Sequence, residues 1–375
     1  MPDKSGFAHY MIKEIFEQPR AVRETVLGRV SEKNSLVTLG DIRVSREDFS
    51  ALNKIVVAAS GTSRHAGMAG RYMIQELADI PVEVEHASEF EYGNPITGPQ
   101  ELVIVITQSG ETADTLGALR KAKERGARTL AISNVLDSTI AREADGVIHT
   151  LAGPEISIAS TKAFTAQLAA LYLFAVYLGE VRATLKQDRA KALIDELLQI
   201  PEKIETVLGR NSQCRELAEQ YHKVEDFLFI GRGIHYPIAL DGALKLKEVS
   251  YIHAEGYPAG EIKHGPYALI DETLPLVGIA TRDTRDPLSM SRWERNLASL
   301  AEVKKRGGRV IAIATAGDDR IRQAAHHVID VPEAPELVSP ILEIVPMQLL
   351  AYHVAVQRGL DVDRPRNLVK SVTVE

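Results

Sequence analysis

Short runs of β-branched and other apolar residues alternate along this chain with longer segments whose apolar residues recur at helical spacing. Strands that are buried on both faces have continuous apolar runs of this kind, so the alternation predicts parallel sheets covered by helices on both sides. In the first half of the chain, strands are expected at residues 54–59, 82–86, 102–107, 128–132 and 147–150. In the second half, they are expected at residues 227–230, 276–280, 310–314 and 328–331, with helices beginning near Pro237, Leu288, Asp319 and Ile341.

One segment of the first half has a counterpart 181 residues later. Arg125-Gly-Ala-Arg-Thr-Leu-Ala-Ile-Ser133 resembles Arg306-Gly-Gly-Arg-Val-Ile-Ala-Ile-Ala314. The same offset relates Val147-Ile148 to Val328-Ile329 and Gln167-Leu168 to Gln348-Leu349. A constant offset across three segments in order predicts an internal repeat of whole domains.

The predicted fold class is therefore α/β, with two tandem domains that are each a doubly wound, flavodoxin-like three-layer sandwich. We expect a helical arm at residues 1–40, with its helix near Tyr10–Val26, followed by a first domain at residues 41–183. A helical linker at residues 184–224 should be broken at Pro201, because proline cannot donate a helical hydrogen bond. A second domain at residues 225–360 and a charged C-terminal tail at residues 361–375 complete the chain.

Composition restricts the classes of protein to which the chain can belong. Of 375 residues 45% are apolar, which is enough for two cores, and the single cysteine, Cys214, cannot form an internal disulfide. The net charge of −7 disfavours a nucleic-acid-binding face. The most apolar segment, Ala163–Leu178, is interrupted by polar residues and is shorter than about 18 residues, so it predicts a buried helix rather than a membrane span. We expect a cytoplasmic protein with no cofactor, no metal site and neither nucleic acid nor membrane as a partner.

Two predicted strand-to-helix loops of the first domain have the residues of an anion site. Ser60-Gly-Thr-Ser63 follows the first predicted strand, and Gln108-Ser-Gly-Glu-Thr112 follows the third. Ligands of open parallel sheets bind beyond the carboxyl ends of the strands, where helix N-termini present free N–H groups. Hydroxyl groups and backbone donors at two such loops could bind a phosphate group without a lysine. Alternatively, these serines and threonines are ordinary helix N-caps.

Nucleotide-binding motifs are absent from the sequence. It has no Walker A pattern, and Gly231-Arg-Gly233 is followed at the third glycine position by Tyr236.

A predicted helix at Pro237–Ala254 has three charged residues on one face. Asp241, Lys245 and Glu248 are spaced by four and three residues, while apolar residues cover most of the rest of the helix. The charges either form a salt-bridge ladder at a domain edge or contribute acid–base chemistry. Isomerisation of a sugar needs a carboxylate that moves a proton between adjacent carbons and a cation that stabilises developing charge, which are roles suited to Glu248 and Lys245. His264, in a predicted loop that ends in Gly265-Pro266, could titrate near neutral pH or could be a packed or solvated histidine.

Longer motifs identify a family resemblance over almost the whole chain. They are His9-Tyr-Met-Ile-Lys-Glu-Ile-Phe-Glu-Gln-Pro19, Gln108-Ser-Gly-Glu-Thr-Ala-Asp-Thr115, Ala159-Ser-Thr-Lys-Ala-Phe-Thr165, Gly242-Ala-Leu-Lys-Leu-Lys-Glu248, His253-Ala-Glu255, Lys263-His-Gly-Pro266 and Pro365-Arg-Asn-Leu-Val-Lys-Ser-Val-Thr-Val-Glu375. With these motifs the chain resembles the isomerase half of the glucosamine-6-phosphate synthases (glutamine:fructose-6-phosphate amidotransferases). That half consists of two sugar isomerase (SIS) domains, which agrees with the predicted duplication.

The resemblance implies a set of site residues. The sugar phosphate would be bound by Thr62, Ser63, Gln108, Ser109 and Thr112, and the sugar pocket would be lined by Ile158, Ser160 and Asp241. Lys370 would form a Schiff base with the open-chain ketose, Glu248 would move the proton between C1 and C2, and Lys245 would be its acid–base partner. His264 would open the sugar ring from a neighbouring subunit, which implies a homodimer. A Schiff-base lysine must be partly neutral, so we expect burial or a nearby cation such as Lys245 beside Lys370.

The chain departs from the synthase pattern at several positions. Cys214 is its only cysteine and lies far from the start of the chain, so we expect no glutamine hydrolysis, which the family performs with an N-terminal cysteine. Ser60, Thr107 and Asp241 replace the Cys, Ser and Glu expected in the synthases, and these are chemically mild changes.

Several functions therefore remain open. The chain could aminate fructose-6-phosphate with free ammonia or with ammonia from a partner, or deaminate glucosamine-6-phosphate in the reverse direction. It could instead be a piece of a longer synthase, or a non-catalytic SIS sensor of sugar phosphates.

Overall fold

The computed structural model describes residues 3–30, 37–40 and 42–372. Residues 1–2 and 31–36 of the predicted arm, residue 41 and residues 373–375 of the predicted tail lie outside the described part. The chain divides into two compact units. The first unit contains residues 20–155, 162–199 and 369–375, and the second contains residues 1–19, 156–161 and 200–368. The C-terminal segment therefore belongs to the same unit as the first sheet.

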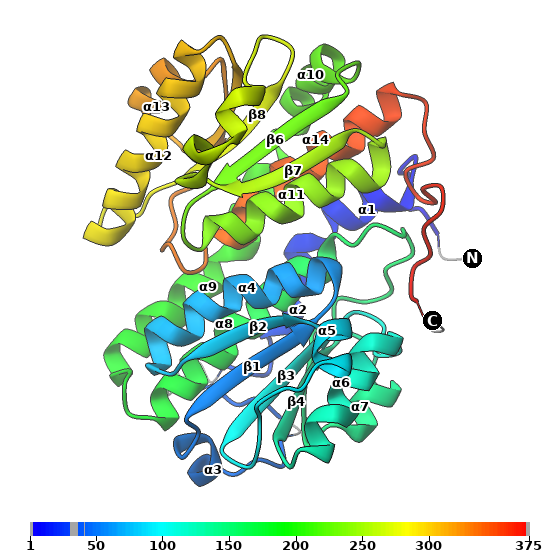
Figure 1. Ribbon diagram of the computed structural model, residues 1–375, viewed down its shortest axis with the longest axis vertical. Helices are drawn as coiled ribbons and strands as arrows, with labels where there is room; N and C mark the ends of the chain where they lie inside the picture. Colours follow the sequence, from blue (N-terminus) through cyan, green and yellow to red (C-terminus); the bar gives the residue numbers. More distant parts are fainter. Residues whose placement is uncertain (1–2, 31–36, 41, 373–375) are drawn as a thin grey trace. The chain divides into compact units, whose positions relative to one another are not determined.

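The first unit is built around a parallel sheet with the strand order β2-β1-β3-β4-β5. Its strands are β1 (Lys54–Ala59), β2 (Val82–His86), β3 (Glu101–Thr107), β4 (Arg128–Ser133) and β5 (Gly146–His149). Its helices include α3 (Arg46–Ser50), α4 (Gly61–Ala78), α5 (Ala87–Tyr92), α6 (Ala113–Glu124), α7 (Thr139–Glu143) and α8 (Lys162–Val181). Helices α4 and α8 cover one face of the sheet, and α5, α6 and α7 cover the other (Figure 1).

The two faces of this sheet follow from alternation along each strand. In β1, Val56 and Ala58 belong to the apolar cluster under α5 and α6, which includes Phe90 and Leu119. Val57 points to the opposite face, where it lies against Gly67 of α4. All five residues from Ile55 to Ala59 are buried, so β1 is the continuous apolar run expected of a strand covered on both sides.

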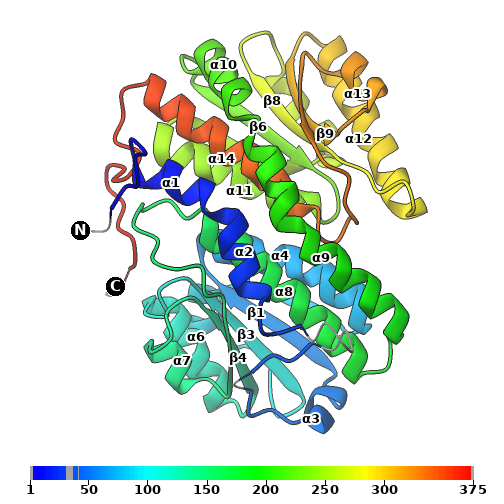
Figure 2. The same cartoon turned by 180° about the vertical axis from the view of Figure 1, so that it is seen from behind.

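The second unit repeats this arrangement, with the strand order β7-β6-β8-β9-β10 and all strands parallel. Its strands are β6 (Asp226–Gly231), β7 (His253–Pro258), β8 (Pro275–Ala280), β9 (Arg309–Thr315) and β10 (His327–Val331). Its helices include α1 (Tyr10–Phe16), α10 (Asn211–Tyr221), α11 (His235–Ser250), α12 (Pro287–Lys305), α13 (Asp319–Ala324) and α14 (Pro340–Gln357). Helices α10, α11 and α14 lie on one side of the sheet, and α12 and α13 lie on the other (Figure 2). The predicted α/β fold with two parallel, helix-covered sheets is confirmed.

Two elements differ from the sequence prediction. The helix predicted to extend to Ala254 ends at Ser250, because Tyr251 adopts a left-handed conformation with φ of 62°. The chain then forms β7, an edge strand that pairs only with β6 within its sheet and is mostly half-buried. An edge strand needs no continuous apolar run, which explains why His253-Ala-Glu-Gly-Tyr-Pro258 was not predicted as a strand.

The predicted break at Pro201 is wrong. Helix α9 (Gln187–Leu208) continues through this residue. Leu197, Ile200 and Ile204 are fully buried along the same helix. Packing of this apolar side therefore outweighs the hydrogen bond that proline cannot make. The boundary between the two units falls within α9, between Gln199 and Ile200. Helix α2 (Gln18–Val26) follows α1 in the predicted arm.

Helix α8 is long and apolar enough to cross a membrane by length and hydropathy alone. However, 83% of its most apolar 18-residue stretch is buried inside the structure, and α8 packs closely against α4. The prediction of a buried core helix is therefore confirmed.

Candidate active site

The first predicted anion loop joins β1 directly to α4. Ser60 precedes the helix in an extended conformation, and its side chain makes no capping hydrogen bond. Thr62 is buried, and Ser63 is half-buried in the first turn. Ser63 Oγ accepts a hydrogen bond of 3.0 Å from Nε2 of Gln167 on α8. The Ser60 side chain is thus not used as an N-cap, and α8 orients the Ser63 hydroxyl at the helix start.

The second loop gathers three hydroxyl groups at the N-terminus of α6. Thr107 Oγ1 accepts the amide of Gly110 at 3.2 Å, and Ser109 Oγ accepts the amide of Glu111 at 3.2 Å. Thr112 precedes the helix without capping it, and its Oγ1 lies 3.2 Å from Thr107 Oγ1. These hydroxyl groups therefore lie at the N-terminal end of α6, where an anion is stabilised by the helix dipole.

Glycine is required at the centre of this loop. Gly110 has a φ of 70°, a left-handed conformation that side chains disfavour. A Cβ atom at this position would also overlap the hydroxyl group of Ser138. The neighbouring Gln108 is half-buried, and its carbonyl accepts the amide of Asn134 at 3.3 Å. The loop conformation is thus specified by its own sequence and by Asn134 and Ser138, which follow β4.

The C-terminal segment places Lys370 in the same unit as both loops. Lys370 Nζ lies 2.6 Å from Glu155 Oε2, and the Glu155 side chain is fully buried. The carbonyl of Val372 accepts the amide of Ala113, the first residue of α6, at 3.0 Å. The tail is therefore bound beside the second anion loop. One partner of Nζ is therefore a buried anion.

The charged face of α11 lies in the second unit. Asp241 and Lys245 are fully buried, and Lys245 Nζ lies 2.5 Å from Glu248 Oε2. The Glu248 side chain is 22% exposed, so one end of this ion pair reaches the surface. A buried ammonium group is tolerated because its partner carboxylate compensates for lost solvation.

The remaining predicted residues also belong to the second unit. His264 is exposed at the end of the short 3₁₀ helix η1 (Glu261–His264) rather than in an irregular loop. Ile158 and Ser160 are half-buried in the segment 156–161, where the Ile158 amide donates to the carbonyl of Asp363 at 3.1 Å. The structure thus brings together the anion loops and Lys370 in one unit, and Lys245 and Glu248 in the other.

Sequence reasoning missed a buried ionic network at the carboxyl ends of β6 and β8. His235 Nδ1 lies 3.0 Å from Glu343 Oε2, and its Nε2 lies 3.2 Å from Glu336 Oε1. Arg292 Nε donates to Glu336 Oε1 at 2.7 Å, and the hydroxyl of Thr281 donates to Glu343 Oε1 at 2.6 Å. Burial acts to raise the pKa of the Glu343 carboxyl, but the charge of His235 and hydrogen bonds to the carboxylate lower it.

This network occupies the edge of the second sheet that corresponds to the anion loops of the first. No motif connects its members, which lie on separate elements.

Cys214 is not a nucleophile in this structure. The thiol is buried on α10, and burial raises its pKa to about 12. A thiol with such a pKa is protonated at neutral pH and therefore unreactive.

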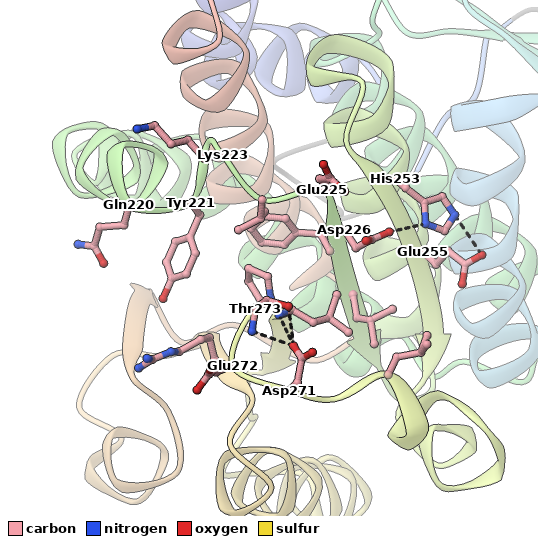
Figure 3. Close-up of a pocket in the computed structure, with 17 residues that line it drawn as sticks. Gln220, Tyr221, Lys223, Glu225, Asp226, His253, Glu255, Asp271, Glu272 and Thr273 are labelled. Carbon is pink, nitrogen blue, oxygen red and sulfur yellow. Dashed lines mark hydrogen bonds and ion pairs between the residues drawn. The ribbon is translucent and has the colours of Figure 1, made fainter.

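The second unit also has a hollow of about 780 Å³. It is lined by residues at the starts of several strands, including Asp226 of β6, His253 of β7 and Pro275 of β8, and by Asp271 and Glu272 (Figure 3). His253 Nδ1 lies 2.9 Å from Asp226 Oδ1. The hollow is therefore at the amino ends of the strands, opposite the edge where parallel sheets bind their ligands, and it contains none of the predicted site residues.

Comparison with known proteins identifies the family. The model of the SIS domain matches residues 49–177 and 220–358, one match for each sheet. The chain belongs to the SIS domain family. The domain limits proposed from the sequence, 41–183 and 225–360, enclose most of both matches.

The relatives with similar sequences are aminotransferases. The chain is 50% identical over 373 residues to glutamine–fructose-6-phosphate aminotransferase (isomerizing) of Chlorobaculum tepidum, and 49% identical to that of Thermus thermophilus. These matches cover 100% of this chain but only 59% and 60% of the relatives, so the chain spans about three-fifths of their length. Among solved structures, the C-terminal domain of glucosamine-fructose-6-phosphate aminotransferase from Francisella tularensis is 38% identical with a TM-score of 0.90. That match covers 97% of this chain and 100% of the other.

Proposed function

We propose that this protein is a sugar-phosphate aminotransferase and isomerase that converts fructose-6-phosphate and ammonia to glucosamine-6-phosphate. The proposal is supported by the names of the relatives, which act on fructose-6-phosphate, and by the similarity to the C-terminal domain of one of them. The observation that carries it is the Lys245–Glu248 pair, because a buried ammonium group beside a partly exposed carboxylate suits proton transfer. A deaminase would run the same chemistry in reverse.

The first unit would bind the phosphate end of the sugar. Thr62 and Ser63 at the start of α4, with Gln108, Ser109 and Thr112 before α6, would donate to phosphate oxygens. Charge-assisted hydrogen bonds contribute on the order of 1.5 to 3 kcal/mol each, so several of them suffice without a lysine. Ile158, Ser160 and Asp241 of the second unit would line the sugar pocket.

The chemical steps would divide among four residues. His264 would open the sugar ring by moving the proton of the anomeric hydroxyl group. Lys370 Nζ would form a Schiff base at C2 of the open ketose, with loss of water. Ammonia would then add to C2 and displace the Lys370 amine, which leaves an imine of ammonia at C2. Glu248 would then move a proton between C1 and C2, while Lys245 would stabilise the charge that develops on the neighbouring oxygen.

We further infer a homodimer in which His264 enters the site of the other subunit, which is supported by its exposed position on η1. The Cys214 thiol is buried and protonated, so we propose that the ammonia is not released by this thiol. A cytoplasmic location is proposed on the single unpaired cysteine.

The proposal is tested by replacing Glu248 with glutamine, which keeps hydrogen bonding and removes the proton acceptor. Fructose-6-phosphate with and without ammonium, and glucosamine-6-phosphate, are incubated with the protein while glucose-6-phosphate, glucosamine-6-phosphate and ammonia are followed. We expect Glu248→Gln to lower kcat about 100-fold or more with the Kd for the sugar phosphate within about twofold. The matched control is Glu272→Gln, an exposed residue of the same unit, which should leave both constants unchanged.

Equal activity in Glu248→Gln and the unaltered protein would refute the role of Glu248. Sugar binding without turnover in every mixture would indicate a sugar-phosphate sensor instead.

A further inference from the structure

The buried carboxylate of Glu155 contacts two parts of the first unit. Its Oε2 lies 2.6 Å from Lys370 Nζ, and its Oε1 accepts the amide of Ala163 at 3.1 Å. Ala163 is the second residue of α8, so the carboxylate connects the C-terminal tail to the start of a buried core helix. The Glu155 side chain has no exposed surface, whereas that of Lys370 is 24% exposed.

The same helix also holds the first anion loop. Gln167, four residues after Ala163 on α8, donates to Ser63 Oγ at 3.0 Å. Both Ala163 and Gln167 are buried in a helix whose side chains are almost all buried. Helix α8 therefore helps to position both the Lys370 amine, through Glu155, and the Ser63 hydroxyl, through Gln167.

A second contact binds the tail to the other anion loop. The amide of Ala113 at the start of α6 donates to the carbonyl of Val372, two residues after Lys370. The tail therefore has one attachment through a side-chain charge and one through its backbone. The ion pair with Glu155 involves Lys370 Nζ itself, so this ion pair determines where the amine lies.

We propose that Glu155 is the positioning residue that holds Lys370 and the C-terminal tail beside the second anion loop. It acts through Lys370 and through α8, and does not itself contact the sugar. The inference rests on the proposed function only in taking Lys370 as the reactive amine. The seating of the tail is measurable without any reaction.

The test replaces Glu155 with glutamine. The glutamine Oε1 can still accept the Ala163 amide, so the substitution keeps the contact with α8 and removes only the negative charge that faces Nζ. The matched control is Glu180→Gln, a half-buried glutamate near the opposite end of the same helix.

The first measurement is hydrogen exchange at the Ala113 amide, whose protection reports the Val372 contact. We expect exchange at least tenfold faster in Glu155→Gln and unchanged exchange in Glu180→Gln. The second is borohydride reduction in the presence of fructose-6-phosphate, which converts an imine at Lys370 to a secondary amine detected by mass spectrometry. We expect at least tenfold less labelling and a similarly lower kcat in Glu155→Gln, with the KM for fructose-6-phosphate within about twofold.

Different results overturn the two proposals. If the unaltered protein is not labelled at Lys370 but is labelled elsewhere or not at all, the Schiff-base role fails, while faster Ala113 exchange in Glu155→Gln still supports the seating of the tail. If Ala113 exchange is the same in Glu155→Gln as in the unaltered protein, Glu155 does not position the tail. A parallel rise in KM and fall in kcat would indicate general disruption of the site and would also contradict the proposed role.

Discussion

His353 on α14 is a histidine that burial holds in its neutral form. Burial, with a smaller contribution from Arg215, lowers its pKa to about 4. Nε2 lies 2.7 Å from Asn211 Oδ1 on α10, which fits a neutral ring that donates from Nε2. The unfolded chain binds a proton at this position below about pH 6.5. Stability should therefore be lost as the pH falls from about 6.5 to about 4.

His353→Gln tests this dependence, because glutamine keeps an N–H donor and does not titrate. Urea unfolding at pH 7.5 and pH 5.0 should show that the unaltered protein loses on the order of 1–2 kcal/mol more stability than the variant. The expected difference in stability is smaller than the full shift of the His353 pKa would give, since water reaches part of the ring. An identical pH dependence in both proteins would mean that His353 is already solvated in the folded state.

Single residues of the candidate site were predictable to different extents. Ser63, Ser109 and Thr112 could be selected because hydroxyl residues follow strands at positions where parallel sheets bind anions. Lys370 and Glu155 could not be selected from spacing. They are 215 residues apart in the sequence and meet only because the tail belongs to the first unit.

Helices α4 and α8 pack so closely that glycines lie at two of their contacts. A Cβ atom on Gly179 of α8 would lie 2.6 Å from the backbone oxygen of Leu77 on α4. A Cβ atom on Gly70 of α4 would lie 2.8 Å from the end of the Leu171 side chain on α8. A side-chain end can rotate away, whereas a backbone carbonyl within a helix cannot. The two contacts should therefore tolerate alanine differently.

We expect Gly179→Ala to lower the free energy of unfolding by about 1–3 kcal/mol, because overpacking forces the helices apart. Gly70→Ala should change it by less than about 1 kcal/mol, since the gain in helix propensity of about 0.5–1 kcal/mol offsets a small rearrangement of Leu171. Urea unfolding of both variants measures the difference. Equal effects would show that the α4–α8 contact adjusts as a whole.

Elements with strong apolar periodicity were predicted well, and elements held by tertiary contacts were not. The strand at residues 54–59 matches β1 residue for residue, because burial on both faces leaves a continuous apolar run. β7 lacks such a run, and in α9 the local signal of Pro201 wrongly indicated a break. β7 forms because it pairs with β6. Helix α9 continues through Pro201 because its leucine and isoleucine residues are packed in the interior.

At the scale of the whole molecule, the proposed dimer predicts complementation between inactive variants. Glu248→Gln and His264→Ala chains are each inactive under the proposed mechanism. In a mixed dimer, one site combines Glu248 of one subunit with His264 of the other, and the second site lacks both. Equal amounts of the two chains, mixed and allowed to exchange subunits, should therefore recover about one quarter of the activity of the unaltered protein.

The measurement is the rate of glucosamine-6-phosphate formation before and after mixing, with each variant mixed with itself as the control. If no activity returns although subunit exchange is demonstrated by mass spectrometry, His264 acts within its own subunit.

By itself, the sequence determined the α/β class, the two parallel sheets and the loops that follow β1 and β3, because these depend on apolar periodicity and on residue types at strand ends. Tertiary structure alone decided which unit contains the C-terminal tail, that Glu155 faces Lys370, and that His235 lies between two carboxylates. These are contacts between residues far apart in the chain, made by polar side chains with no periodic pattern. Their geometry depends on how separate elements pack, which local sequence does not encode.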